Sequence, residues 1–446
     1  MQACDLLIGA GMLIAMDDAD TRIRDGAAAV IGDTIVEIGR IEDLREKYRA
    51  GKEIFQPEGA VLPGFINAHS HETLTRGLHE DLPLMRWLEE VCYPIENAYS
   101  PEDMTAAAMM NQLELIKGGV TSSIDIFRFA DRAIEVAKRS GLRMTFSPQS
   151  FDATSDRMEN TKKTLELAKE FHGSGNGRIR VWFGPHAPYS CGPDSYAEAA
   201  ELARLYGLGV HTHLCETDSE LEIIRGRYGV SPVEYLDNAG VLDVPCILAH
   251  SIHLTDDDIR LLADKRENCS LVYNPISNLK LADGVCPVPA LLQAGCTLGL
   301  GTDSNLSNNA LDMFAEMRIG GYIQKTWNND ATIMPCYQML YLATRGSAAA
   351  MKLDALTGSL QAGKRADIIV VSFTEPHMWP VYYENPSNVV EQIVYAGRAS
   401  DVSATVVDGR VLMENRKVLT LNEDEAFEMV RRQSRSLYRR SFQGGA

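Results

Sequence analysis

The sequence predicts an α/β fold, namely a (β/α)8 TIM-like barrel with a small β-sandwich domain built from both chain termini. Eight apolar segments of strand length recur through the middle of the chain, most of them separated by stretches able to form helices. Short strand-like segments occur near both termini, and reactive polar side chains collect where the apolar segments end. With 446 residues, the chain is long enough for one large barrel and a satellite domain.

The N-terminal region has the pattern of short strands separated by turns. Asp25-Gly26 and Gly32-Asp33 carry the turn signals, and strands are expected at 5–8, 11–16, 27–31 and 34–39. Similar strands return at 366–371 and 404–409. The simplest arrangement is one small β domain, residues 1–60 plus 364–446, with the barrel inserted as residues 61–363. The Arg-rich segment 425–442 is interpreted as a solvated amphipathic helix.

The eight barrel strands are expected at 61–71, 120–127, 142–151, 179–188, 209–216, 246–254, 270–277 and 297–304. Strands that alternate with helices eight times are typical of a parallel barrel. The intervals 161–171 and 194–206 suit its outer ring of helices. In such barrels the chemistry takes place where the strands end, at the C-terminal face.

Composition excludes several classes of partner. The net charge of −18 argues against nucleic acid and acidic membranes, and no apolar run reaches the length of a membrane span. The nine cysteines are scattered without a C-x-x-C pair, which fits reduced thiols. We read no signal peptide and therefore expect a cytoplasmic protein.

Histidines and one acid collect at the expected strand ends. His69 and His71 share one face of strand one because side chains alternate along a strand. Strand five ends with His213, preceded on the same face by His211, which we leave as a core or supporting residue. Strand six ends at His250 and strand eight at Asp303. A buried histidine on its own is usually a hydrogen-bonded core residue, and Asp303 alone could be a helix cap. Their recurrence at strand ends favours a metal site for zinc or ferrous iron.

The same strand ends offer groups for proton transfer. A cation lowers the pKa of a bound water, and Glu216 is placed to protonate the electrophile. Asp303 would take the proton from water, and His250 would steady the attacking oxygen. No lysine lies at the end of strand four or strand five, which favours one metal over a carbamylated-lysine pair. The H-x-E and P-C-x-x-C signature of the zinc base deaminases is absent.

Motifs spread over nearly the whole chain resemble the amidohydrolase superfamily, and within it the 5'-methylthioadenosine/S-adenosylhomocysteine deaminases, which are related to the triazine hydrolases. They lie at 63–71, 74–78, 81–84, 87–88, 184–189, 213–217, 249–254, 274–281, 301–303 and 307–309. The resemblance implies one divalent metal ion per subunit, zinc first and iron second, bound by His69, His71, His213 and Asp303. It also implies that Glu216, His250 and Asp303 carry out the proton transfers.

The resemblance assigns the substrate contacts as well. Glu96 would hold the ribose hydroxyls, His186 would contact the adenine ring, and Trp87 and Arg157 would complete the substrate-binding set. The alternatives are a solvated loop acid for Glu96 and a turn residue for His186. The stretch 145–150 lacks an arginine that some members use for the homocysteine carboxylate, which favours methylthioadenosine. Ser304-Asn305-Leu306 replaces the Gly-Ala-Ala usual in the family, so the loop after strand eight is expected to be reshaped.

The sequence thus predicts hydrolytic deamination of an adenosine-type nucleoside to the inosine analogue and ammonia, with methylthioadenosine preferred and S-adenosylhomocysteine or adenosine as further substrates. The expected partner is this small nucleoside, with no nucleic acid and no membrane, and we expect a homo-oligomer. One alternative is another ring amino- or chlorohydrolase acting on an s-triazine, 8-oxoguanine or guanine. A remoter alternative is a non-catalytic binding module.

Overall fold

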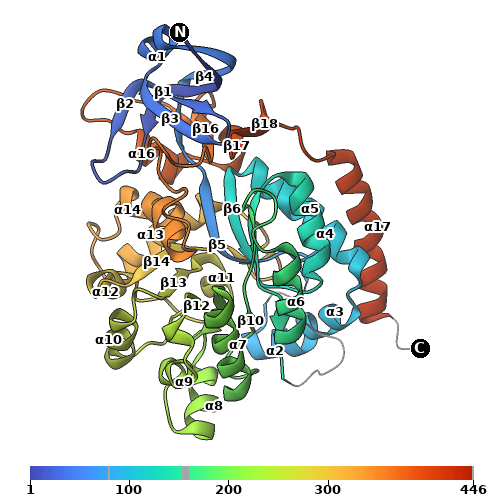
Figure 1. Ribbon diagram of the computed structural model, residues 1–446. Coiled ribbons are helices and arrows are strands. Elements are labelled where there is room, and N and C mark those ends of the chain that lie inside the picture. The colour runs from blue at the N-terminus through green and yellow to red at the C-terminus, as the bar shows by residue number, and fades with distance from the viewer. Residues whose placement is uncertain (79–80, 153–159, 444–446) are drawn as a thin grey trace.

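The computed structural model describes residues 1–78, 81–152 and 160–443 and contains a closed barrel of parallel strands (Figure 1). The barrel strands are β5 Phe65–His71, β6 Val120–Asp125, β7 Arg143–Phe146, β9 Ile179–Val181, β11 Val210–Leu214, β12 Cys246–His250, β13 Cys269–Tyr273 and β14 Thr297–Leu300. A parallel bridge between Phe183 and Val210 joins the two halves on one side. On the other side, β15 Asp303–Ser304 pairs with β5. The predicted barrel is therefore confirmed.

Short strands and helices complete the barrel. The strands are β8 Gln149–Ser150 and β10 Gly184–Pro185. The helices are α4 Pro101–Lys117, α5 Ala130–Ser140, α6 Thr161–Phe171, α7 Pro193–Tyr206, α8 Asp218–Tyr228, α9 Pro232–Asn238, α10 Asp256–Asp264, α11 Pro275–Lys280, α12 Val288–Gln293, α13 Met313–Trp327, α14 Cys336–Tyr341 and α15 Ser347–Ala350. Local sequence sets their ends: Ser100 and Asp103 form a capping box at the start of α4. Gly141, at φ 85°, ends α5.

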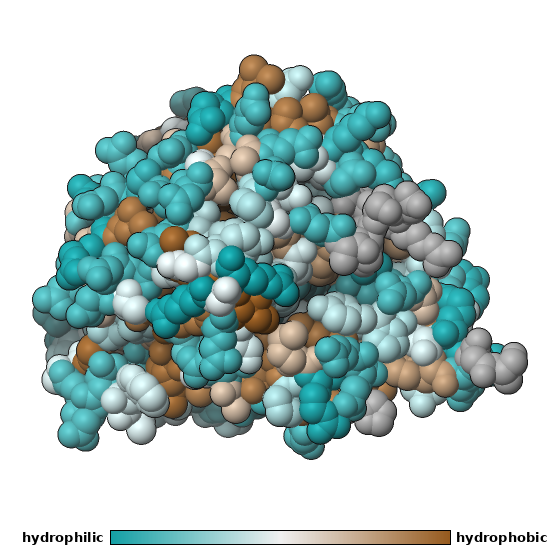
Figure 2. Space-filling model, turned by 90° about the horizontal axis from the view of Figure 1, so that it is seen from below, coloured by the Kyte–Doolittle hydropathy of each residue, from teal (hydrophilic) through white to brown (hydrophobic). Residues whose placement is uncertain are grey.

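A short helical segment covers the end of the barrel at which the strands finish. It consists of α2 Leu84–Trp87, a π-helical turn Leu88–Cys92 and α3 Tyr93–Ala98. Seen from this end, the molecule has a largely hydrophilic surface with hydrophobic side chains in scattered patches (Figure 2). The segment brings Trp87 and Glu96 over the strand ends, and π-helical turns of this kind are frequent at functional sites.

The chain termini build one eight-stranded sheet at the opposite end (Figure 1). In spatial order it contains β19 Lys417–Val418, β18 Arg410–Glu414, β17 Val402–Val407, β16 Ile368–Ser372, β4 Tyr48–Pro63, β1 Gln2–Ile14, β2 Arg22–Ile31 and β3 Thr34–Arg40. The sheet folds over an apolar core that includes Ile8, Val30 and Val406. A hydrogen bond of 2.8 Å from Ile35 N to Lys364 O brings β3 back beside the entry to β16. Strands from both termini thus form the small β domain, as predicted.

Two details of the N-terminal prediction were wrong. The strands expected at 5–8 and 11–16 are one continuous strand, β1. Asp25-Gly26 is no chain reversal, because Gly26 pairs with Ala10 on one side and Arg40 on the other, inside β2. Only Gly32-Asp33 makes the expected turn, between β2 and β3.

The remaining elements are short helices and turns. They are α1 Ile41–Lys47, α16 Val389–Glu391, the π-helical turns Leu342–Gly346 and Gln392–Ala396, and the 3₁₀ turns Val241–Asp243, Pro376–Met378 and Ala399–Asp401. The last helix, α17 Glu423–Phe442, lies along α4 and α3 on the flank of the barrel (Figure 1). Among the residues described, no helix is long and apolar enough to cross a bilayer.

A buried ion cluster joins the barrel to the terminal sheet. The Arg143 guanidinium on β7 donates to both carboxylate oxygens of Asp367, at 2.9 and 3.2 Å, and also contacts Asp408. The three side chains are buried. Because charges removed from water require close partners, this cluster fixes the terminal sheet against the N-terminal end of the barrel.

Candidate metal and catalytic site

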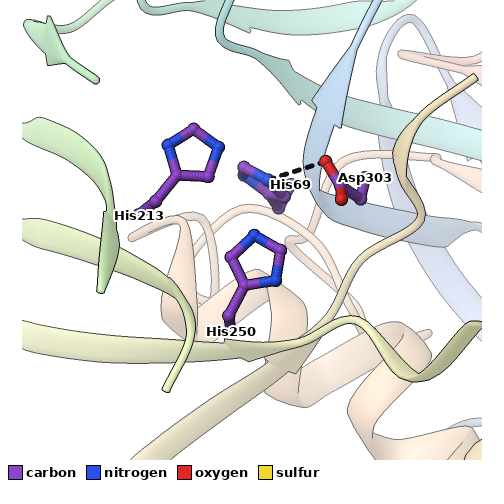
Figure 3. A group of neighbouring side chains, drawn as sticks. All are labelled: His69, His213, His250 and Asp303. Atoms are coloured by element: carbon purple, nitrogen blue, oxygen red, sulfur yellow. Dashed lines mark ion pairs between the residues drawn. The ribbon is translucent and has the colours of Figure 1, made fainter. Parts of the chain in front are cut away.

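Five side chains converge at the C-terminal ends of the barrel strands. His69 and His71 come from the inner face of β5, His213 from β11, His250 from the end of β12 and Asp303 from β15. Figure 3 shows His69, His213, His250 and Asp303 pointing toward one another; donor atoms of these four lie within 4.8 Å of one another. The structure therefore brings together every residue for which the sequence predicted metal binding.

Backbone conformation directs two of these side chains. His250 has φ 72° and Asp303 has φ 61°, both in the left-handed region that residues other than glycine rarely adopt. His250 is the last residue of β12, and Asp303 is the first residue of the short strand β15 that follows β14. Such conformations cost free energy and cluster at functional sites.

The donor separations fit a shared cation. His71 Nε2 lies 3.1 Å from His213 Nε2, and Asp303 Oδ1 lies 3.3 Å from Nε2 of both His69 and His71. Two ligands that each lie about 2.0–2.2 Å from one tetrahedral ion are about 3.4 Å apart. The Nε2 atoms of His69 and His250 are buried and have no hydrogen-bond partner among the described residues. The residues present therefore fit a divalent metal ion.

Neighbouring groups fix the orientation of the imidazoles. His213 Nδ1 donates to the backbone oxygen of His186 at 2.6 Å, which leaves the Nε2 lone pair free for a metal. His69 Nδ1 lies 2.8 Å from Nε2 of His211, so His211 supports a ligand. The amide nitrogen of Asn278 lies 2.7 Å from His250 Nδ1. When this amide donates, the ring hydrogen of His250 sits on Nε2, which suits a hydrogen-bond donor better than a ligand.

Burial sets the protonation states at the centre of the site. It lowers the pKa of His213 to about 4 and holds that of His71 well below its usual value. Burial alone would raise the pKa of Asp303. The nearby imidazoles of His69 and His250 nevertheless hold the pKa of Asp303 well below its usual range. Near neutral pH, His71 and His213 are thus neutral imidazoles and Asp303 is an ionised carboxylate, the forms that bind metals.

Glu216 stands next to this cluster. Its Oε1 lies 3.6 Å from His250 Nε2. The side chain is buried, and burial, reinforced by the neighbouring carboxyl groups of Asp283 and Asp303, raises the pKa of Glu216 well above its usual range. The carboxylate of Glu220 accepts from the backbone N–H groups of Cys215 and Glu216, both at 3.0 Å, and so fixes the loop that carries the acid. A carboxyl that retains its proton near neutral pH can act as a general acid.

A cavity of about 60 Å³ adjoins these groups. Trp87, Glu96 and His186 line it together with the metal-site residues, whereas Arg157 falls outside the described residues. Trp87 Nε1 is buried without a hydrogen-bond partner among the described residues. The predicted substrate contacts that the structure describes thus surround the same cavity as the acid.

Sequence reasoning missed Arg128. This buried side chain forms an ion pair of 2.8 Å with Glu96 and donates at 2.9 Å to the backbone oxygen of the same residue. The arginine follows β6 by three residues and Glu96 lies on α3, so only the folded arrangement brings them together. Its position just past a strand end was the one signal available. The pair holds the Glu96 carboxylate at the wall of the cavity.

Comparisons with known proteins agree with this fold. The model of the amidohydrolase family matches residues 60–412. A 5-methylthioadenosine/S-adenosylhomocysteine deaminase from Pelotomaculum thermopropionicum is 38% identical over 435 residues, covering 97% of this chain and 98% of that protein. A protein of the same name from Moorella thermoacetica is 37% identical over 410 residues, covering 92% and 94%.

Solved structures give the same result. The crystal structure of an adenosine deaminase from Xanthomonas campestris with bound zinc is 31% identical and has a TM-score of 0.93, covering 98% of this chain and 99% of that one. An atrazine chlorohydrolase from Arthrobacter aurescens shares the fold at 23% identity, with a TM-score of 0.86 and coverage of 97% and 99%. The resemblance predicted from the motifs is confirmed: the chain belongs to the amidohydrolase family.

Proposed function

We propose that this protein is a metal-dependent hydrolase that deaminates adenosine-type nucleosides, 5'-methylthioadenosine and S-adenosylhomocysteine foremost, to the inosine analogue and ammonia. One observation carries the proposal. A buried carboxyl with a raised pKa, Glu216, stands beside a His–Asp metal cluster, in a cavity that His186 and Glu96 also line. The deaminase names of the full-length relatives support the same reaction.

His69, His71, His213 and Asp303 would hold the metal. Zinc is the first choice, because the His and Asp donors suit it and the similar adenosine deaminase has bound zinc. When bound, such a cation makes hydroxide available near neutral pH by lowering the pKa of water. The cytoplasmic location and the homo-oligomer expected from the sequence stay part of this proposal.

The chain's own groups then move the protons. Glu216 donates to N1 of the purine, which makes C6 more electrophilic. His250 Nε2 donates a hydrogen bond to the oxygen that attacks C6, and Asp303 accepts the proton that water loses. Water adds at C6, and Asp303 passes the proton it took from water to the exocyclic amine, which leaves as ammonia. The remaining hydroxyl proton returns to Glu216, and the oxygen stays on C6 as the carbonyl of the inosine analogue. General acid–base steps of this kind each contribute about 10²–10⁴-fold in rate.

Substrate entry requires movement of the cavity walls. The cavity measures about 60 Å³, whereas sites for small organic ligands span about 300–1,000 Å³. Residues 84–98 cover one side and carry both Trp87 and Glu96. We infer that this segment moves outward to admit a nucleoside and then returns Glu96 to the ribose hydroxyls.

A substrate panel tests the proposed function. Ammonia release is measured with methylthioadenosine, S-adenosylhomocysteine, adenosine, 8-oxoguanine and melamine, together with elemental analysis of the protein as isolated. We expect release from the nucleosides, and about one zinc per subunit as the tetrahedral donor set implies. Turnover of melamine or 8-oxoguanine without turnover of any nucleoside would contradict the proposal.

Removing the acid tests the mechanism. Glu216→Gln keeps the shape of the side chain but takes away its carboxyl proton, so we expect kcat to fall by about 10²–10⁴-fold with unchanged zinc content. Glu222→Gln is the matched control, because Glu222 lies on the neighbouring helix α8 and is exposed. Undiminished turnover in metal-replete Glu216→Gln protein would exclude this residue as the proton donor.

A further inference from the structure

A second and larger cavity, of about 640 Å³, lies beyond His186. Tyr189 lines both this outer cavity and the inner one that holds Glu216. Tyr93 and Asn97 form another part of the outer wall. These two residues flank Glu96 on α3, so the outer cavity begins where the groups assigned to ribose end.

The wall shared by the two cavities indicates which part of the substrate would face the outer cavity. Phe151, an outer-cavity residue, stacks on His186 with ring centroids 4.5 Å apart, and Tyr189 meets the same imidazole edge-on at 5.7 Å. With the purine at Glu216 and the ribose at Glu96, the 5' substituent is the part that leaves the inner cavity. The aromatic wall suits an apolar thioether.

Two opposite charges line the outer cavity without neutralising each other. Arg227, near the end of α8, is exposed and forms no ion pair among the residues described. Asp152 accepts one hydrogen bond on each oxygen, from Gly192 N at 2.5 Å and from Ser195 Oγ at 2.6 Å. These bonds fix the carboxylate, and each oxygen retains a lone pair for another donor.

We propose that Arg227 and Asp152 form a subsite for the amino-acid end of S-adenosylhomocysteine. Arg227 binds its carboxylate and Asp152 binds its ammonium group, while the thioether lies against Phe151. This inference rests on the proposed function. The lack of an arginine at 145–150 favoured methylthioadenosine as the substrate. With Arg227 on α8 as the positive charge, S-adenosylhomocysteine is expected to bind as well.

Steady-state kinetics with two substrates tests the subsite. Zinc-loaded wild-type, Arg227→Gln and Asp152→Asn proteins are assayed with S-adenosylhomocysteine and with methylthioadenosine, which has no amino-acid end. We expect KM for S-adenosylhomocysteine to rise about 10-fold or more in Arg227→Gln, because a charge-assisted contact is lost. Asp152→Asn raises it in the same direction. For both variants, kcat on either substrate and KM for methylthioadenosine stay unchanged.

Arg225→Gln is the matched control, since Arg225 is exposed on the same helix but does not line the cavity. Three results would decide against the subsite. Equal effects of Arg227→Gln on the two substrates, or none, overturn the subsite alone. The same KM increase in Arg225→Gln would mean that the loss of any positive charge on α8 raises KM, and it also overturns the subsite. A wild-type enzyme that releases ammonia from neither nucleoside overturns the proposed function, and the subsite with it.

Discussion

At the residue scale, His211 and His213 show what separates a metal ligand from its support. Both point to the same side of β11 because they are two residues apart. That pattern left open which of them binds metal, although proximity to the strand end favoured His213. In the fold, His213 Nε2 lies beside Nε2 of His71, among the metal-site donors. His211 Nε2 instead contacts Nδ1 of His69. The distinction depends on depth in the barrel, which periodicity does not encode.

His211 therefore acts on the metal through His69. We expect His211→Phe, which keeps a buried ring but removes the contact to His69 Nδ1, to weaken zinc binding by about 10–100-fold. Competition with a chromophoric chelator measures the affinity. His377→Phe is the control, because His377 pairs with Asp401 in the C-terminal part of the chain. Equal zinc affinity in His211→Phe and wild-type protein would show that His69 does not need this support.

Residues whose role depends on a neighbour in space could not be identified from the sequence. His69, His71, His250 and Asp303 stand at strand ends, so strand prediction was enough to group them. Arg128 was missed because its partner, Glu96, belongs to a helix that follows a different strand. An ion pair between separate elements leaves no periodic trace in the sequence.

At the scale of elements, glycine explains the wrong strand boundaries near the N-terminus. The gap expected between the strands at 5–8 and 11–16 contains Gly9, and Gly26 was assigned to a turn, yet both glycines lie inside strands. A Cβ on Gly9 would come within 2.5 Å of the Cβ of Ala27, and one on Gly26 within 2.5 Å of the Cβ of Leu13. These glycines permit close approach inside a folded sheet, a role that competes with turn formation. The barrel strands were easier to predict because they are short, continuous apolar runs that are buried on both faces.

The Arg143 cluster makes a prediction for the contact between the barrel and the terminal sheet. Arg143→Met leaves the buried carboxylates of Asp367 and Asp408 without their main cation, so we expect the free energy of unfolding to fall by about 3–5 kcal/mol. Urea unfolding followed by circular dichroism measures this. Arg139→Met is the control: Arg139 pairs with Glu425 at the surface at 3.2 Å, where such pairs contribute about 0–1 kcal/mol. Similar losses in the two variants would exclude a special role for the buried cluster.

At the scale of the whole molecule, the fold keeps uncharged forms of several acids and imidazoles around the site. Burial raises the pKa of Asp125 to about 7 and that of Asp283 to about 8, and it lowers those of His211 and His250. The chain as a whole nevertheless has a net charge of −18. The net charge therefore reflects mainly the exposed side chains, whereas the site depends on ionisable groups that folding removes from water. Each such group links protonation to the stability of the entire fold.

Glu220 gives the clearest test of this linkage. Burial, partly opposed by the N–H groups of Cys215 and Glu216, raises its pKa from 4.5 to about 7. A raised carboxyl pKa means that the folded protein binds the proton more tightly than the unfolded chain. The associated stability is therefore fully present below pH 4.5 and is lost as the pH rises toward 7. At 1.36 kcal/mol per pKa unit, this loss amounts to about 3 kcal/mol.

Glu220→Gln cannot ionise, so its stability relative to wild type should increase by about 3 kcal/mol between pH 4.5 and pH 8. The pH-independent cost of altering the two hydrogen bonds cancels in this difference. Urea unfolding of both zinc-free proteins at the two pH values provides the measurement. Glu222→Gln, which removes an exposed carboxyl two residues away on the same helix, is the matched control. If the stability difference between Glu220→Gln and wild type is the same at pH 4.5 and pH 8, Glu220 is ionised in the folded protein across this range. The buried carboxylate would then have to be stabilised by its backbone N–H partners beyond what its burial costs.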